Sequence, residues 1–296
     1  MNAAPVLLAY TALVSFVAPR LLMRACWPYR SPALAAAVWQ ILLISFSIGA
    51  ALSAYNLAMP SEHLHADLAG LLHACGLDVE RGHWFAIALP GIVGLALVAS
   101  LALHLMRARL ARTRHRRALD LVGDRSDRLR ATVLPYDTPA AYCLPGHRPR
   151  IVVSDAAVRV LSPEQLGAVL EHERAHITGR HHLALAATEA FRSVFGRLPL
   201  ARHAAEQTAL LLEMTADDRA LRRHTSEALA TAMYEMAAAR APEGAFAAGG
   251  HTVLIRLKRV LAPRPAPHPA FWGSIAATAA SVPLLPLLIA CPLVLG

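Results

Sequence analysis

Two histidines separated by three residues, with a glutamate after the first, form the pattern His172-Glu173-x-x-His176. Residues four apart on a helix lie on one face, so both imidazoles can reach a single zinc ion. Glu173 projects beside them, where a carboxylate can take a proton from a zinc-activated water. The pattern predicts a hydrolytic centre with one Zn²⁺ per chain, His172 and His176 as metal ligands and Glu173 as general base.

Catalytic zinc requires a third protein ligand, and the sequence offers two candidates for it. His182 completes the metzincin string H-E-x-x-H-x-x-G-x-x-H, in which a turn at Gly179 brings the third histidine to the metal. Glu213 and Asp217 instead lie one turn apart on a later helix, where a zinc ion and a histidine Nδ1–H would compensate the two carboxylates. Good helix formers after Gly179 predict continuation rather than a turn. This favours Glu213, with Asp217 and His181 in supporting contacts behind the ligands.

The elements that position these residues are predicted to be mainly helical. Ser162 is a helix N-cap, Pro163 takes the first helical position and Gln165 completes a capping box, so the zinc-binding helix begins here. Short apolar segments punctuated by prolines predict a small antiparallel sheet at residues 131–134, 140–144 and 151–154. We therefore expect a mainly α-helical protein that carries an α+β, gluzincin-like zincin domain.

Four long stretches of the chain are almost free of charge, although the protein as a whole is basic. Of its 296 residues, 56% are hydrophobic and 17% are charged, and the net charge is +9. A helix needs about 20 apolar residues to cross the hydrocarbon core of a bilayer. We predict four transmembrane helices, the last one bent by prolines, at residues 1–25, 33–58, 84–106 and 270–295.

Loop charge predicts the orientation of these spans, because short basic loops remain in the cytosol. Residues 19–32, at the end of the first span and just after it, hold three arginines and no acid, whereas residues 60–83 hold four acids and one arginine. Six arginines follow the third span within eleven residues. We expect a multi-pass protein of the cell inner membrane with both termini outside. Residues 60–83 would be a short extracytoplasmic loop, and residues 107–264 a cytosolic peptidase domain.

The same features exclude several other classes of protein. The apolar content is too high for a disordered chain, and four cysteines without a CxxC pair are too few for a disulfide-stapled module. The arginine-rich segment lies next to a predicted span, where anionic headgroups explain it, so no nucleic-acid contact is expected. The spans also lack the internal charges that a transporter needs.

Several segments resemble the BlaR/MecR family of integral membrane zinc metallopeptidases, and more distantly the HtpX and CAAX-protease group. The similar segments are residues 139–146, 151–154, 161–166, 169–177 and 213–219. The placement of a zincin domain between the third and fourth of four spans matches as well.

The resemblance implies a role for each residue of the predicted centre. His172, His176 and Glu213 would bind zinc, Glu173 would be the base, and Asp217 would orient a ligand. It also implies that one edge strand holds the substrate backbone by strand addition, and this strand consists of Ala140, Ala141, Tyr142, Cys143 and Leu144.

Two features depart from that family. Its well-known members continue past the fourth span into an outside penicillin-binding sensor domain, whereas this sequence ends at Gly296, so we expect no such domain here. Many relatives also have Asp where this chain has His181. The resemblance still suggests a signalling protease of the antibiotic-response type.

The sequence therefore predicts a membrane zinc endopeptidase that cleaves a cytosolic protein, by resemblance a transcriptional repressor. Its partners would be this substrate and the lipid bilayer, with self-association left open. Two alternatives remain. One is an HtpX-like protease for the quality control of membrane proteins. The other is a non-catalytic membrane transducer whose domain is braced by a structural zinc site, which would need four protein ligands.

Overall fold

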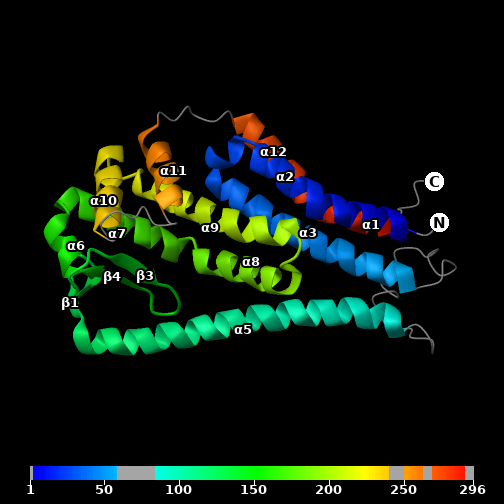
Figure 1. Cartoon of the computed structure of the whole chain (residues 1–296), viewed down its shortest axis with the longest axis horizontal. Coiled ribbons are helices and arrows are strands. Elements are labelled where there is room, and N and C mark those ends of the chain that lie inside the picture. The colour runs from blue at the N-terminus through cyan, green and yellow to red at the C-terminus, as the bar shows by residue number, and fades with distance from the viewer. Residues whose placement is uncertain (1–2, 59–83, 240–249, 263–268, 291–296) are drawn as a thin grey trace.

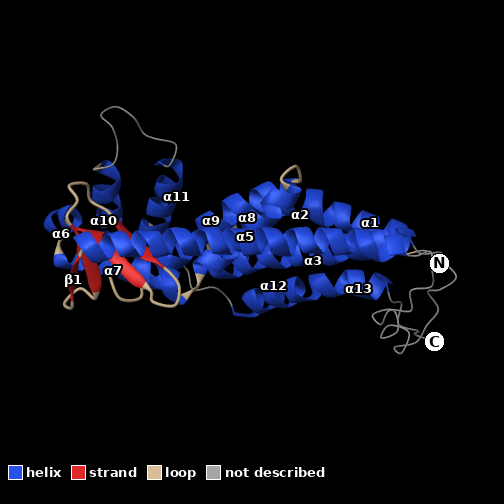
Figure 2. Cartoon of the chain, turned by 90° about the horizontal axis from the view of Figure 1, so that it is seen from below, coloured by secondary structure: helices blue, strands red, loops and turns tan. Residues whose placement is uncertain are grey.

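A computed structural model describes residues 3–58, 84–239, 250–262 and 269–290. The molecule is elongated, and helix α5 (Trp84–Val122) runs along most of its length (Figure 1). The strands gather at one end of α5, and the apolar N-terminal helices lie beside its other end (Figures 1 and 2).

Four helices are long and apolar enough to cross a membrane, as judged by length and composition. The first combines α1 (Ala4–Ala12), a π-helical turn (Leu13–Val17) and α2 (Ala18–Arg24). A 3₁₀ turn (Trp27–Tyr29) leads to α3 (Pro32–Ala58), and α5 follows as the third. The fourth comprises α12 (Pro269–Ser281), a 3₁₀ turn (Val282–Leu284) and α13 (Leu285–Ala290). The predicted loop at residues 60–83 lies outside the described residues.

The four strands form one sheet in the order β1-β2-β4-β3. They are β1 (Asp124–Ser126), β2 (Ala131–Leu134), β3 (Ala141–Leu144) and β4 (Arg150–Ser154). The expectation of a purely antiparallel sheet is wrong, because β2 and β4 pair in parallel. The chain leaves β2, passes to the edge as β3 and returns as β4, which inserts between them. The short polar strand β1 was not predicted.

Helices cover both faces of this sheet. Tyr142, Leu144 and Val152 face Leu119 near the end of α5. Ile151 and Val153 face the opposite way, into an apolar cluster with Leu166, Val169 and Leu170 of α7 (Pro163–Thr178). The sheet therefore packs between α5, the third apolar helix, and α7, which carries the His-Glu-x-x-His pattern.

The remaining helices follow α7 in a compact series. The predicted capping box is confirmed, since the Ser162 side chain accepts from Gln165 N–H and the Gln165 side chain accepts from Ser162 N–H. Before it comes α6 (Asp155–Val160), and after it α8 (His181–Phe195), α9 (Pro199–Ala220), α10 (Ser226–Ala238) and α11 (Gly250–Leu261).

Helices α8 and α9 form a hairpin that packs among the apolar N-terminal helices. The ring of Phe46, midway along α3, lies 5.6 Å from Phe191 and 5.2 Å from Phe195, both on α8. Trp39 and Leu42 of α3 share one apolar cluster with Leu200 and Leu211 of α9. The hairpin carries the predicted ligand Glu213, so the site and the apolar helices belong to a single packed unit.

The contact between α5 and α8 can be tested by cross-linking. The Ser100 and Ser193 hydroxyl oxygens lie 2.5 Å apart. With the four native cysteines replaced by serine, S100C/S193C should therefore form a disulfide on mild oxidation. Mass spectrometry of a non-reduced digest detects the linked peptides. The control pair S100C/S226C places the second thiol on α10, and equal cross-linking of the two pairs would contradict this packing.

Candidate active site

The two histidines of the predicted centre lie on one face of α7, one turn apart. His172 is buried and His176 is half-buried. Their Nε2 atoms are 3.1 Å apart, and their ring centroids are separated by 4.8 Å. The spacing of four residues therefore converges two imidazole nitrogens on one point, as expected of residues at i and i+4 on a helix.

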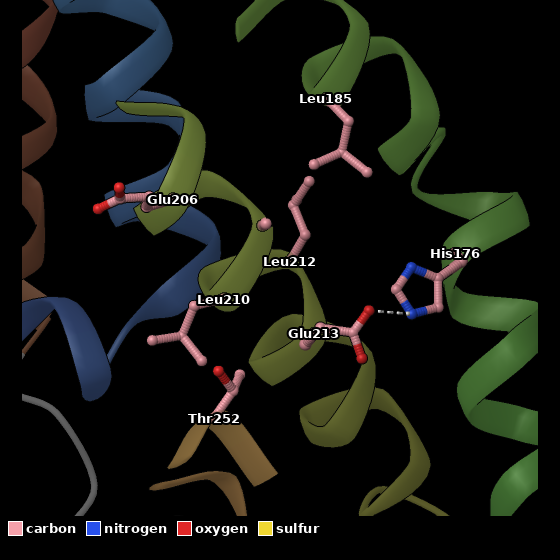
Figure 3. A pocket seen from close by; sticks show the side chains of 8 residues that line it. His176, Leu185, Glu206, Leu210, Leu212, Glu213 and Thr252 are labelled. Carbon is pink, nitrogen blue, oxygen red and sulfur yellow. Dashed lines mark ion pairs between the residues drawn. The ribbon is translucent and has the colours of Figure 1, made fainter. Parts of the chain in front are cut away.

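Helix α9 brings Glu213 to the same point. Its Oε1 lies 3.3 Å from His176 Nε2 (Figure 3). Its Oε2 lies 3.5 Å from His172 Nε2. A tetrahedral ion at zinc–ligand distances of about 2.0–2.1 Å keeps its ligand atoms about 3.3 Å apart. The three side chains therefore fit a zinc ion, and among the described residues they form a group able to hold a metal.

The outer nitrogen of each imidazole has a partner behind it. His172 Nδ1 lies 3.0 Å from Oδ1 of Asp217, whose side chain is fully buried. His176 Nδ1 lies 2.9 Å from His181 Nδ1, so one of these nitrogens donates to the other. Such contacts fix the tautomer and the orientation of a metal-binding histidine and leave Nε2 free for the ion.

His181 reaches this position because the chain breaks between α7 and α8. The expected continuation of the helix past Gly179 is wrong. Thr178 ends α7, and Arg180 adopts a left-handed conformation (φ 50°) before α8 begins. A Cβ on Gly179 would lie 2.4 Å from His181 Nε2, so only glycine leaves room for this ring. The turn does not bring His182 into the metal-binding group.

Arg256 of α11 completes the site, although no sequence motif singles it out. Its Nε and Nη2 donate to the two oxygens of Asp217 at 2.9 and 2.7 Å, and its Nη1 lies 2.7 Å from Glu213 Oε2. The sequence does contain a sign of this role, because Arg256 falls at a helical spacing of three or four residues from Val253, Leu257 and Val260, which form the apolar face of α11. A charged residue on the apolar stripe of a helix needs a buried partner.

A second arginine on α11 strengthens the attachment to α9. Arg259 forms a two-bond ion pair with Asp218, both contacts at 2.8 Å, and donates to the Tyr29 carbonyl at 2.6 Å. Two adjacent aspartates on α9 thus each bind one arginine of α11. The arrangement fixes α11 against the helix that carries Glu213.

The local electrostatics favour a positive charge between the three ligands. Burial alone would lower the pKa of His172, but the Asp217 and Glu213 carboxylates outweigh it and raise this pKa to about 9. Burial lowers the pKa of His176 to about 4, so this ring stays neutral at pH 7. Burial opposes ionisation of Glu213, yet His172 and Arg256 lower its pKa to about 2. A metal binds a neutral imidazole and an ionised carboxylate, so His176 and Glu213 are already in the binding forms, and a metal ion would displace the proton that His172 holds.

Glu173 lies next to the metal-binding group and beside the edge strand. Burial raises the pKa of its carboxyl. The Cys143 thiol of β3 hydrogen bonds to this carboxylate, and burial followed by the charge of Glu173 raises the thiol pKa to about 12. Cys143 therefore stays protonated and donates to Glu173.

Strand β3 presents an open edge at the same place. The Ala140 carbonyl accepts from Ser154 N–H, so the backbone groups of Ala140, Tyr142 and Leu144 point toward β4. By alternation, the backbone groups of Ala141 and Cys143 point the other way. Within the described part of the chain, no strand pairs with that edge.

A protein-family model matches the part of the chain that holds His172, His176 and Glu213. Residues 105–243 match Peptidase family M48. The match supports a zincin metallopeptidase of the M48 family and covers α7, α8, α9 and the sheet. Comparison with curated proteins and with solved structures gives no match.

The contact between Asp217 and His172 can be tested with two neighbouring aspartates. Asp217→Asn removes the charge behind His172 and should lower zinc affinity about 10–100-fold, the usual effect of losing such a partner. Asp218→Asn removes the partner of Arg259 instead and should leave zinc affinity within about threefold of the parent. Competition with a chelator measures both, and equal losses in the two variants would contradict the assignment.

Proposed function

We propose that this chain is a membrane-embedded zinc endopeptidase that hydrolyses peptide bonds on the cytosolic side. The observation that carries the proposal is the convergence of three side chains, His172, His176 and Glu213, whose nearest nitrogen and oxygen atoms lie 3.1 to 3.5 Å apart. Glu173 and the open edge of β3 lie beside them. The match to Peptidase family M48 supports the same reaction class.

Each residue of the site would have a separate role in peptide hydrolysis. A zinc ion bound by His172, His176 and Glu213 would polarise the scissile carbonyl and lower the pKa of water. Glu173 takes a proton from the attacking water and passes it to the leaving amine, and its raised pKa suits both transfers. The backbone groups of Ala141 and Cys143 hold the substrate as an added strand.

Three ligands favour a catalytic site over a structural one. Structural zinc is closed by four protein ligands, whereas catalytic zinc keeps one position open. The metal-binding group of the described residues contains three side chains. This supports an enzyme rather than a non-catalytic transducer.

The charge distribution supports a cytosolic location for the site. Arg20 and Arg24 end the first apolar helix, and Arg107 begins the basic half of α5. Positively charged segments next to spans remain inside the cell. We place the metal centre on the inner face of the cell membrane and both chain termini outside.

The first candidate for the substrate is a cytosolic protein of the transcriptional-repressor type. It rests on the resemblance to the BlaR/MecR family and would make the chain a signalling protease of an antibiotic response. The open edge of β3 supports a substrate segment that enters in extended form.

The second candidate is a membrane protein, cleaved close to the bilayer in the manner of quality-control proteases. The packing of the α8–α9 hairpin on α3 favours it, because Met214, the neighbour of Glu213, shares an apolar cluster with Ala35 and Ala36 near the start of α3. A segment leaving the membrane would meet the centre without first crossing the cytosol.

Replacing Glu173 with Gln tests the reaction and the substrate class together. The amide cannot accept the proton of the water, so cleavage should fall at least about 100-fold while zinc stays bound. Quantitative proteomics of cells with the parent or Glu173→Gln chain would reveal cytosolic or membrane-protein fragments that vanish in the variant.

The half-buried Glu235 on α10, which lies outside the metal-binding group, provides the control. Glu235→Gln makes the same chemical change away from the centre and should leave the fragments unchanged. Full cleavage by Glu173→Gln would refute the proposed role of this residue.

A further inference from the structure

A cavity of about 220 Å³ opens directly beside two of the proposed metal ligands, His176 and Glu213 (Figure 3). Leu185 of α8 and Thr252 of α11 form part of its wall. Small-molecule and cofactor pockets usually measure about 300–1,000 Å³. This cavity is smaller, so its size suits one amino-acid side chain better than a separate ligand.

One face of α9 forms the longest wall of the cavity. Glu206, Ala209, Leu210 and Glu213 follow the spacing i, i+3, i+4 and i+7, so they lie in one row along the helix. Glu213 stands at the metal end of the row. Glu206 stands at the other end, and its exposed carboxylate points away from Leu185 and Leu212 (Figure 3). The apolar pair Ala209 and Leu210 lies between the two acids.

The apolar lining continues into the cluster that packs against the apolar N-terminal helices. Leu212 is buried in that cluster, and Leu185 and Leu210 pack on it. The cavity therefore has a fixed apolar wall beside the metal ligands. An apolar side chain placed there is removed from water, which is favourable by about 25 cal/mol for each Å² buried.

We propose that this cavity is the specificity subsite of the peptidase and receives a large apolar side chain next to the scissile bond. The inference rests on the proposed peptidase function, because the cavity adjoins the atoms that would hold the metal. The Glu213 carboxylate at its metal end disfavours acidic side chains. Substrates would be segments with Leu, Ile, Met or Phe beside the cut and no Asp or Glu at that position.

Two substitutions should change the preferred size of the residue beside the scissile bond in opposite directions. Ala209 is exposed on its helix, so Ala209→Phe can fill the cavity without removing a core contact. It should shift cleavage toward Gly, Ala and Ser beside the cut. Leu210→Ala enlarges the cavity and should shift cleavage toward Phe and Trp. Ala238→Phe makes the first change on an exposed site of α10 and serves as the control.

The assay uses the full chain in detergent, loaded with zinc, and a synthetic decapeptide library with every residue represented at the central positions. Mass spectrometry maps the cut sites. The ratio of large apolar to small residues beside the cut should fall about tenfold in Ala209→Phe, rise in Leu210→Ala and stay unchanged in Ala238→Phe.

The outcomes separate this inference from the proposed function. If the parent cuts the library but both cavity variants keep its preference, the cavity is not the subsite while the peptidase assignment stands. If the zinc-loaded parent cuts no peptide, the peptidase assignment fails and the subsite fails with it. Zinc content and gel filtration of each variant show that it is folded.

Discussion

Two carboxylates on α9 and the basic side chains that contact them, His172 and Arg256, determine the architecture of the site. Glu213 and Asp217 lie one turn apart, and ionised carboxylates at that spacing repel each other. They are held together because His172 lies 3.5 Å from Glu213 and 3.0 Å from Asp217. Arg256 forms an ion pair of 2.7 Å with each of the two carboxylates. A bound zinc ion would add the remaining positive charge. Removal of His172 or Arg256 leaves each carboxylate with one partner fewer, which is most costly for the fully buried Asp217.

This requirement links elements that are far apart in the chain. His172 comes from α7, the carboxylates from α9 and Arg256 from α11, the last described helix before α12. The same α9 packs along α3, and the same α7 packs on the sheet whose edge strand carries Cys143. The metal-binding group, the open strand edge and the apolar cavity therefore share one rigid framework.

Local sequence rules predicted part of this structure. The capping box at Ser162, the proline-bent last apolar helix and the strand positions follow from short-range preferences, and the structure has all of them. The pairing of Glu213 with the histidines followed from the chemistry of zinc. The parallel pairing of β2 with β4, the role of Arg256 and the packing of the hairpin on α3 did not follow. Each depends on contacts between distant segments, and a break at Gly179–Arg180 depends on the space that His181 needs.

The central claim is that zinc is held by two histidines of α7 and Glu213 of α9. The most direct measurement is the zinc content of the purified full chain after substitution of either candidate third ligand. Glu213→Ala should lose most of the metal, whereas His182→Ala should retain about one zinc per chain, since His182 lies outside the metal-binding group. Full zinc content in Glu213→Ala together with loss in His182→Ala would contradict the account.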